Sequence, residues 1–359
     1  MRFPHPVVGL IEGFYGMMWP DEHRLAVVDA LGRLGYAFYH YAPKADPSVR
    51  NRWRQAWDEA AVATLTELGE HVKANGMRFG LGISPIGLQN GMDQVDRAAL
   101  AARIEQMNAI GHDNLVVMFD DEAGSVDGLA EVQADIVHCA AERSHASRVF
   151  LCPTYYSDDP LLDELFGTRP NGYAQVIGRR LDPAVEIYWT GPKVVSETIP
   201  VDYIAAVAET LGRKPVLWDN YPVNDSPRMI RHLYLRAFTG RPAGLAEVTA
   251  GHAINPALQP HLSMIPAATL PMVYRQGDDY DPDAAFGKAA RACVGDELAG
   301  SLHQDLAQLH DRGLGDLDGD ERSGLRACYA AFDHPAANEV VRWLDGTYRA
   351  FEDLATTDE

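Results

Sequence analysis

Short apolar runs, rich in β-branched and aromatic residues, alternate with amphipathic stretches along most of the chain. Such a run predicts a buried strand, and apolar residues spaced three or four apart predict a helix. The predicted strands are Val7–Phe14, Tyr36–Ala42, Met77–Ser84, Asn114–Asp121, Arg148–Tyr155, Glu186–Gly191, Pro215–Asn220 and Gly244–Thr249. The predicted helices between them include Asp21–Leu34, Trp57–Asn75, Gln94–Ile110, Gly128–Ala141 and Val201–Leu211. The strands begin about 30–40 residues apart, close to the ~31 residues per unit expected when about 250 residues form eight β/α units.

The predicted strands are apolar on both faces, as the run Leu115–Phe119 illustrates. This is the composition of a parallel sheet covered by helices, which either stays open or closes into a barrel. The first strand is not followed by the G-x-G-x-x-G turn of a dinucleotide-binding sheet, because Gly9–Gly13 leads into aromatic residues. Eight units with polar residues at the strand ends favour the α/β class and a (β/α)8 TIM barrel over residues 1–270.

Helical periodicity dominates residues 271–359 and predicts a C-terminal helical region beside the barrel. Asp281 is expected to cap a helix that has Pro282 at its first position. The helices expected in this region are Ala284–Val294, Glu297–His310, Glu321–Phe332 and Glu339–Leu354. Their surface is a candidate for homodimer formation.

Composition and charge narrow the function classes. Hydrophobic residues make up 47% of the chain and charged residues 23%, which excludes a wholly disordered protein. The 31 Lys and Arg against 51 Asp and Glu give a formal net charge of −20. A surface of that sign repels phosphate backbones and anionic lipids, so neither nucleic acid nor a membrane is an expected partner.

The predicted location is cytoplasmic. The four cysteines lie far apart without a C-x-x-C unit, which disfavours zinc or disulfide frameworks. The N-terminus enters the first predicted strand without the apolar segment and cleavage site of a secretory leader.

His23 and His112 follow no partner pattern and are interpreted as surface residues.

Polar and aromatic residues gather at the carboxyl ends of the predicted strands, where the active site of a (β/α)8 barrel forms. These segments are Glu12–Gly16, Tyr41–Asp46, Asp120–Glu122, Pro153–Tyr156, Tyr188–Pro192 and Trp218–Pro222, with Asp225 and Asn255 beyond the last two strands. Carboxylates, amides and a lysine bind hydroxyl groups, and aromatic rings pack against the C–H faces of sugars. The mixture predicts a carbohydrate site.

Asp120 and Asp121 follow a run of five apolar residues, Leu115–Phe119. Two adjacent carboxylates at this position lose solvation and repel one another, which raises the pKa of one of them towards the range of a general acid. A solvated turn that caps the next helix is the structural alternative. A metal site is a third, but no histidine stands at ligand spacing, so no metal and no cofactor are expected.

The adjacency of the two aspartates also bears on mechanism. In most glycosidases the acid and the nucleophile are carboxylates about 5 Å or more apart, on opposite sides of the scissile bond. Neighbouring aspartates instead suit a substrate that supplies its own nucleophile. The carbonyl oxygen of a 2-acetamido group attacks the anomeric carbon, one aspartate orients that group, and the other protonates the leaving oxygen.

Ordered motifs make the chain similar to glycoside hydrolase family 84, the O-GlcNAcases and bacterial β-N-acetylglucosaminidases. They are Gly9–Gly16 with Trp19, Tyr41–Pro47 with Trp53 and Arg54, Gly82–Pro85, Phe119–Asp121, Pro153–Tyr156, Trp189–Val195, Trp218–Asp225 and Ile254–Pro256. The resemblance covers roughly residues 7–285. It implies a retaining exo-β-N-acetylglucosaminidase acting through an oxazoline intermediate, whose partner is a β-GlcNAc-bearing glycoprotein, glycoconjugate or oligosaccharide.

The resemblance also implies residue roles. Asp120 matches the residue that orients the acetamido group, and Asp121 matches the general acid/base. Residues at positions that bind sugar hydroxyls in the family are Gly13 (through its carbonyl), Lys44, Asp225 and Asn255. Residues around the N-acetyl pocket are Tyr156, Thr190, Val194, Trp218 and Asn220.

Three residues depart from the family pattern. Phe119 replaces a tryptophan, Glu122 replaces an apolar residue, and Asp219 is expected to add negative charge near the pocket. Phe119, Glu122 and Asp219 are expected to alter the pH optimum and the leaving groups tolerated.

Two other functions stay open at this point. One is an endo-acting N-acetylhexosaminidase of hyaluronidase type, which the net charge of −20 disfavours for an anionic polymer. The other is a GlcNAc-binding module without catalysis, which has no need of an acid at Asp121. The sequence leaves the natural aglycone open.

Overall fold

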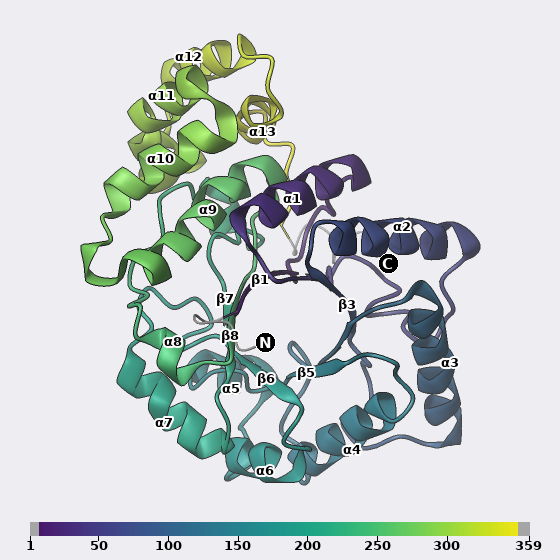
Figure 1. Cartoon of the computed structure of the whole chain (residues 1–359). Coiled ribbons are helices and arrows are strands. Elements are labelled where there is room, and N and C mark those ends of the chain that lie inside the picture. The colour runs from purple at the N-terminus through teal and green to yellow at the C-terminus, as the bar shows by residue number, and fades with distance from the viewer. Residues whose placement is uncertain (1–6, 351–359) are drawn as a thin grey trace.

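The computed structural model describes residues 7–350 as a barrel of parallel strands ringed by helices, with a helical bundle at one side (Figure 1). The strands close in chain order, and β1 pairs with both β2 and β8. They are β1 (Val7–Glu12), β2 (Phe38–Tyr41), β3 (Arg78–Ile83), β4 (Asn114–Met118), β5 (Arg148–Cys152), β6 (Glu186–Trp189), β7 (Val216–Asp219) and β8 (Gly251–Ile254). The predicted (β/α)8 TIM barrel is confirmed.

The barrel helices alternate with these strands. They are α1 (Asp21–Leu34), α2 (Glu59–Ala74), α3 (Gln94–Ile110), α4 (Leu129–Ala141), α5 (Pro160–Phe166), α6 (Tyr173–Arg180), α7 (Val201–Leu211), α8 (Leu245–Val248) and α9 (Pro260–Gln276). Helices α1, α3 and α7 begin and end at the predicted residues because their ends carry clear signals. For α3, Asp93 forms a capping box with Asp96, and Gly111 takes the left-handed conformation that ends the helix.

The prediction for the eighth strand is wrong. Residues 245–248 form the single-turn helix α8, and the strand follows as β8, Gly251–Ile254. Val248 and Thr249 suggested a strand, but Leu245, Ala246 and Glu247 are good helix formers, and no period of two is present. The four residues of β8 pair with β1 and β7 and are fully buried, so they are too few to produce a recognisable pattern.

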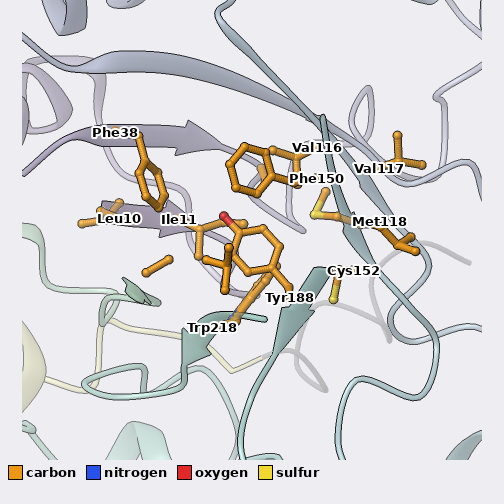
Figure 2. Close-up of a cluster of buried hydrophobic side chains, with 14 of the residues drawn as sticks. Leu10, Ile11, Phe38, Val116, Val117, Met118, Phe150, Cys152, Tyr188 and Trp218 are labelled. Atoms are coloured by element: carbon orange, nitrogen blue, oxygen red, sulfur yellow. The ribbon is translucent and has the colours of Figure 1, made fainter. Parts of the chain in front are cut away.

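Aromatic side chains fill the middle of the barrel. Figure 2 shows Phe38, Phe150, Tyr188 and Trp218 directed into the interior from four different strands. The rings of Phe150 and Tyr188 stack with centroids 5.5 Å apart, and Tyr188 meets Trp218 edge-on at 5.3 Å. Burying each such ring contributes about 1.5–3 kcal/mol. The interior is therefore a packed core, and the strand ends above it have a rigid base.

The C-terminal helices form a second core. They are α10 (Pro282–Val294), α11 (Asp296–Gln304), a π-helical turn at Ala307–Arg312, α12 (Gly319–Ala330) and α13 (Pro335–Leu344). As predicted, Asp281 caps α10, and Pro282 is its first residue. The expected helix Glu297–His310 is interrupted after Gln304, and the expected helix Glu339–Leu354 ends at Leu344, with residues 351–354 outside the described range.

The predicted boundary between residues 270 and 271 lies within α9, and the division into two domains stays a prediction. Helix α9 contributes Ala267 and Leu270 to the barrel core and Ile265 and Met272 to the core of the C-terminal helices. Within residues 7–350, no helix is long and apolar enough to cross a membrane.

Candidate active site

A cleft of about 440 Å³ opens at the carboxyl ends of the barrel strands. Of the predicted site residues, Gly13, Asp120, Asp121, Tyr156, Thr190, Val194, Trp218, Asn220, Asp225 and Asn255 line it. Lys44, the remaining one, is buried beneath the cleft and reaches it through an ion pair with Asp120. The structure thus brings together residues from seven of the eight β/α units. None of these described lining residues is a histidine.

Asp120 is a buried, paired carboxylate. Its Oδ2 lies 2.5 Å from Lys44 Nζ, and both side chains are under 10% exposed. Its Oδ1 is buried and accepts no hydrogen bond from a described residue. An unsatisfied carboxylate oxygen at a cleft wall costs free energy unless a ligand donates to it. Asp120 is therefore prepared to accept a hydrogen bond from a bound N–H group.

Asp121 has a strained backbone. Its φ of +65° is the only positive φ of a non-glycine residue in the described part of the chain. This conformation costs on the order of 1–3 kcal/mol and persists where the surrounding structure enforces it, commonly at functional sites. The turn places the side chains of two adjacent residues in one cleft, whereas successive residues of a regular strand face opposite sides.

The pKa of the Asp121 carboxyl is raised, first by loss of solvation and then by the negative charge of Asp120. Lys44, Arg50 and a hydrogen bond from Tyr15 act in the opposite direction. The net direction is the one that a general acid requires near neutrality.

Two asparagines form a continuous hydrogen-bonded chain across the cleft. Trp218 Nε1 and Asn255 Nδ2 both donate to Asn220 Oδ1, at 3.0 and 2.9 Å. Asn220 Nδ2 in turn donates to the carbonyl oxygen of Val194 at 2.8 Å. These contacts hold the Trp218 ring, which also explains Gly13: a Cβ there would lie 2.3 Å from the ring. Trp218 and Asn220 are therefore fixed in orientation before any ligand arrives.

Backbone contacts hold several other residues of the cleft. The Thr190 N–H donates to the carbonyl oxygen of Tyr156 at 3.0 Å, and the Val194 N–H donates to Asp159 Oδ2 at 3.1 Å. Burial and the charges of Asp121 and Asp120 raise the pKa of the Tyr156 hydroxyl, which keeps it protonated as a donor.

Asp225 accepts the N–H of Tyr15 at 2.8 Å, and burial raises the pKa of Asp225 to about 6. Asp225 is therefore mainly ionised at neutral pH.

Tyr15 and Arg50 also belong to the site, although the sequence analysis did not select them. The Tyr15 hydroxyl donates to Asp121 Oδ2, and Arg50 donates both to the Tyr15 hydroxyl at 2.6 Å and to the Asp121 carbonyl at 3.2 Å. Tyr15 stands in the aromatic run after the first strand, which was a usable signal. Arg50 lies in a loop after the second strand, and no local pattern distinguishes it.

The change Tyr15→Phe is expected to move the alkaline limb of the kcat/KM profile to higher pH. The Tyr15 hydroxyl stabilises the ionised carboxylate and so lowers the pKa of Asp121; its loss raises that pKa. A general acid acts when protonated, so the rate falls as pH rises through its pKa. The profile of a β-GlcNAc substrate measures the limb, with Tyr348→Phe in the C-terminal region as the control. An unmoved or lowered limb would contradict the assigned contact.

Asp219 does not add free negative charge to the pocket, contrary to expectation. It is 1% exposed, is absent from the cleft wall, and is held by Arg241 at 2.7 and 2.8 Å and by His252 at 2.9 Å. Arg241 lowers its pKa to about 2, against the loss of solvation. The role of this residue is to anchor the end of β7, next to Trp218 and Asn220.

The change Arg241→Met is expected to lower the free energy of unfolding by about 3–5 kcal/mol, because it leaves the Asp219 charge buried and unpaired. The pKa of Asp219 is depressed in the fold, so its contribution is complete above its unfolded value and is lost as pH falls towards 2. The deficit of the variant, measured by denaturant unfolding, should therefore be largest near neutrality and shrink in acid. Exposed Arg97→Met is the control, expected within about 0.5 kcal/mol of the unchanged protein.

Glu122 is a buried carboxyl beside Asp120 and Asp121. Burial raises its pKa to about 7, and the Asp120 charge adds to the effect, while a backbone contact from Gly87 opposes it. It does not line the cleft. Its effect on the pH optimum stays a prediction.

The interpretation as a surface residue is wrong for His112, whereas His23 is partly exposed. His112 is 5% exposed and contacts Met107 and Ser144. His23 contacts a second histidine, His261.

Comparison with known proteins gives one family. A family model described as beta-N-acetylglucosaminidase matches residues 8–309. The O-GlcNAcases of Rattus norvegicus and Mus musculus are each 28% identical over 277 residues, which is 74% of this chain and 30% of theirs. The chain thus spans about 30% of the length of these curated relatives. A mutant of the Thermobaculum terrenum O-GlcNAc hydrolase has a similar structure, with a TM-score of 0.78, 25% identity, and coverage of 96% of this chain and 81% of that one.

Proposed function

Because this chain belongs to the β-N-acetylglucosaminidase family, glycoside hydrolase family 84, we propose that it removes terminal β-linked N-acetylglucosamine by exo-hydrolysis with retention of configuration. The proposal rests mainly on one observation: two adjacent aspartates, one paired with lysine and one held in a left-handed turn, share one cleft wall. The pair provides an orienting group and an acid on the same strand end. It does not provide a second carboxylate across the sugar.

Asp120 orients the nucleophile. Its ionised form, held by Lys44, accepts the N–H of the 2-acetamido group at the free Oδ1. This contact directs the acetamido carbonyl oxygen at the anomeric carbon. It also stabilises the positive charge that develops on the amide, and charge stabilisation of this kind is worth about 10²–10³ in rate.

Asp121 moves the proton. As the carbonyl oxygen forms its bond to the anomeric carbon, the glycosidic C–O bond breaks and the leaving oxygen takes the Asp121 proton. The product is an oxazoline whose nitrogen keeps its proton, hydrogen-bonded to the Asp120 carboxylate. Water then attacks the anomeric carbon and gives its proton back to Asp121, and the oxazoline ring opens to the original acetamido group. Two inversions at one carbon give net retention.

The remaining lining residues bind the sugar. The sugar hydroxyl groups bind to the Asp225 carboxylate, the Asn255 amide and the Gly13 carbonyl, which line the cleft, while Lys44 acts through its ion pair with Asp120. The acetamido methyl group fits against Trp218, and the pocket around it is completed by Tyr156, Thr190, Val194 and Asn220. The hydrogen-bonded chain through Asn220 positions Trp218 in advance, so binding costs little side-chain entropy.

The substrate class is a glycoconjugate with a terminal β-GlcNAc. The rodent relatives are O-GlcNAcases and the bacterial one is an O-GlcNAc hydrolase, which makes O-GlcNAc-modified protein the leading candidate for the natural substrate.

A fluorogenic aryl β-GlcNAc substrate tests the proposal. Turnover that a thiazoline analogue of the oxazoline blocks is the expected result. Binding of the analogue without turnover would indicate a non-catalytic module, and cleavage of internal bonds in a defined oligosaccharide would indicate an endo-acting enzyme.

A further inference from the structure

Two histidines and a glutamate from three distant parts of the chain meet outside the cleft. His23 lies on α1, His261 in the first turn of α9, and Glu339 on α13, helices that lie together at the edge of the barrel (Figure 1). His23 Nδ1 and His261 Nε2 are 2.5 Å apart, and with a carboxylate oxygen of Glu339 the three ligand atoms lie within 4.8 Å of one another. No other such group of three occurs within residues 7–350.

Glu339 is a carboxylate without a counter-ion. It is 3% exposed, and its two oxygens accept the backbone N–H groups of His261 at 2.9 Å and Leu262 at 2.8 Å. No described residue forms an ion pair with it. A buried carboxylate is normally paired or bound to a metal. Each oxygen keeps a lone pair for a further ligand.

The two imidazoles share one proton. Nitrogens this close make a hydrogen bond in which one ring donates and the other accepts. The accepting nitrogen carries no proton, which is the form of an imidazole nitrogen that binds metal ions.

We propose that His23, His261 and Glu339 form a binding site for a zinc-class divalent transition-metal ion. The ion takes the place of the proton between the two rings, and that proton moves to the outer nitrogen of the ring that donated it. Two imidazole nitrogens and one carboxylate oxygen are a ligand set that zinc accepts, at about 2.0–2.2 Å. A fourth position is left for water. The ligand types argue against calcium and magnesium, which prefer sets made of oxygen only.

The required movement is small. Ligand atoms around tetrahedral zinc are about 3.3 Å apart, so the two ring nitrogens must separate by roughly 1 Å. The His23 side chain is 29% exposed, so solvent and not packed core adjoins part of the ring.

The ion would join the barrel to the C-terminal helices, because α1 and α9 belong to the barrel and α13 to the bundle. An ion that binds only the folded chain stabilises it by mass action. The site is absent from the cleft wall, so its effect is on stability and not on the proposed hydrolysis.

To test the proposal, metal-free protein is titrated with ZnCl₂. Calorimetry measures the binding of zinc, and the Tm measures its effect on thermal stability. We expect one tightly bound zinc per chain and a Tm higher by several degrees. The change His23→Ala should weaken binding at least about 100-fold, since loss of even an outer partner costs roughly 10–100-fold. The control is His303→Ala, an exposed helical histidine outside the group, which should bind zinc like the unchanged protein.

Cobalt supplies a second measurement that needs no variant. Bound to the unchanged protein, Co²⁺ should give the visible absorption of a four-coordinate site, which His23→Gln removes. Absence of saturable zinc binding, binding that survives His23→Ala, or the spectrum of hydrated cobalt would each overturn the proposal. None of these readouts depends on hydrolysis of a sugar, so failure here is distinguishable from failure of the proposed function.

Discussion

The change Asp121→Asn should reduce kcat/KM on the order of 10³-fold for a β-GlcNAc substrate whose leaving group is a sugar or serine alcohol. An alkoxide leaves only when it is protonated, and a positioned acid contributes about 10²–10⁴ in rate. Asparagine keeps the size of the side chain, but its amide does not supply the proton. An activated aryl substrate, whose phenolate leaves unaided, should lose far less. Paired measurements with the two leaving groups check this difference.

The control for this variant is Asp127→Asn, an exposed aspartate on the same loop, expected to retain full activity. The left-handed turn at Asp121 also favours asparagine, one of the residues that tolerate a positive φ, so the variant should fold normally. Equal losses for both leaving groups would remove Asp121 from the role of acid.

The change Asp120→Asn should reduce kcat/KM by about 10²–10³ for both leaving groups alike. In the proposed mechanism Asp120 orients the acetamido group and stabilises the developing charge, which every substrate requires whatever its leaving group. An asparagine carries no negative charge, and Lys44 is left buried without its partner. The ratio of the two rates therefore separates the two aspartates: it changes in Asp121→Asn and stays constant in Asp120→Asn.

Loss of the Lys44 pair also threatens the fold, at a cost of up to about 3–5 kcal/mol. The Asp120→Asn measurement is thus made together with circular dichroism and binding of the thiazoline analogue. A folded variant that keeps full activity on either substrate would contradict the assignment of Asp120.

Much of the barrel follows from local sequence patterns. Helices α1, α3 and α7 are recognised to the residue because caps and glycines mark their ends. Strand β8 was missed because four buried residues between two partner strands need no alternation, and their pairing depends on residues distant in the chain. Tertiary context thus decides what local propensity leaves open.

The candidate site also has a part that the sequence predicts and a part that depends on tertiary contacts. Residues at strand ends could be placed from the sequence because a barrel brings those ends to one rim. The partners of those residues could not. Neither the contact of Arg50 with Tyr15 nor the pairing of Asp219 with Arg241 follows from sequence spacing. The expectation that Asp219 adds negative charge near the pocket was wrong for this reason. Whether a carboxylate contributes free charge depends on the residues that pair with it, and the sequence does not show those.

In the proposed mechanism the 2-acetamido group of the substrate is the nucleophile. This role is tested most directly with aryl β-glycosides whose acetamido methyl group carries zero, one, two or three fluorines. Each fluorine withdraws electrons from the carbonyl oxygen and weakens its attack on the anomeric carbon. The proposed mechanism predicts that kcat/KM falls steeply with each added fluorine. A rate independent of fluorine number would contradict it and require a nucleophile from the protein.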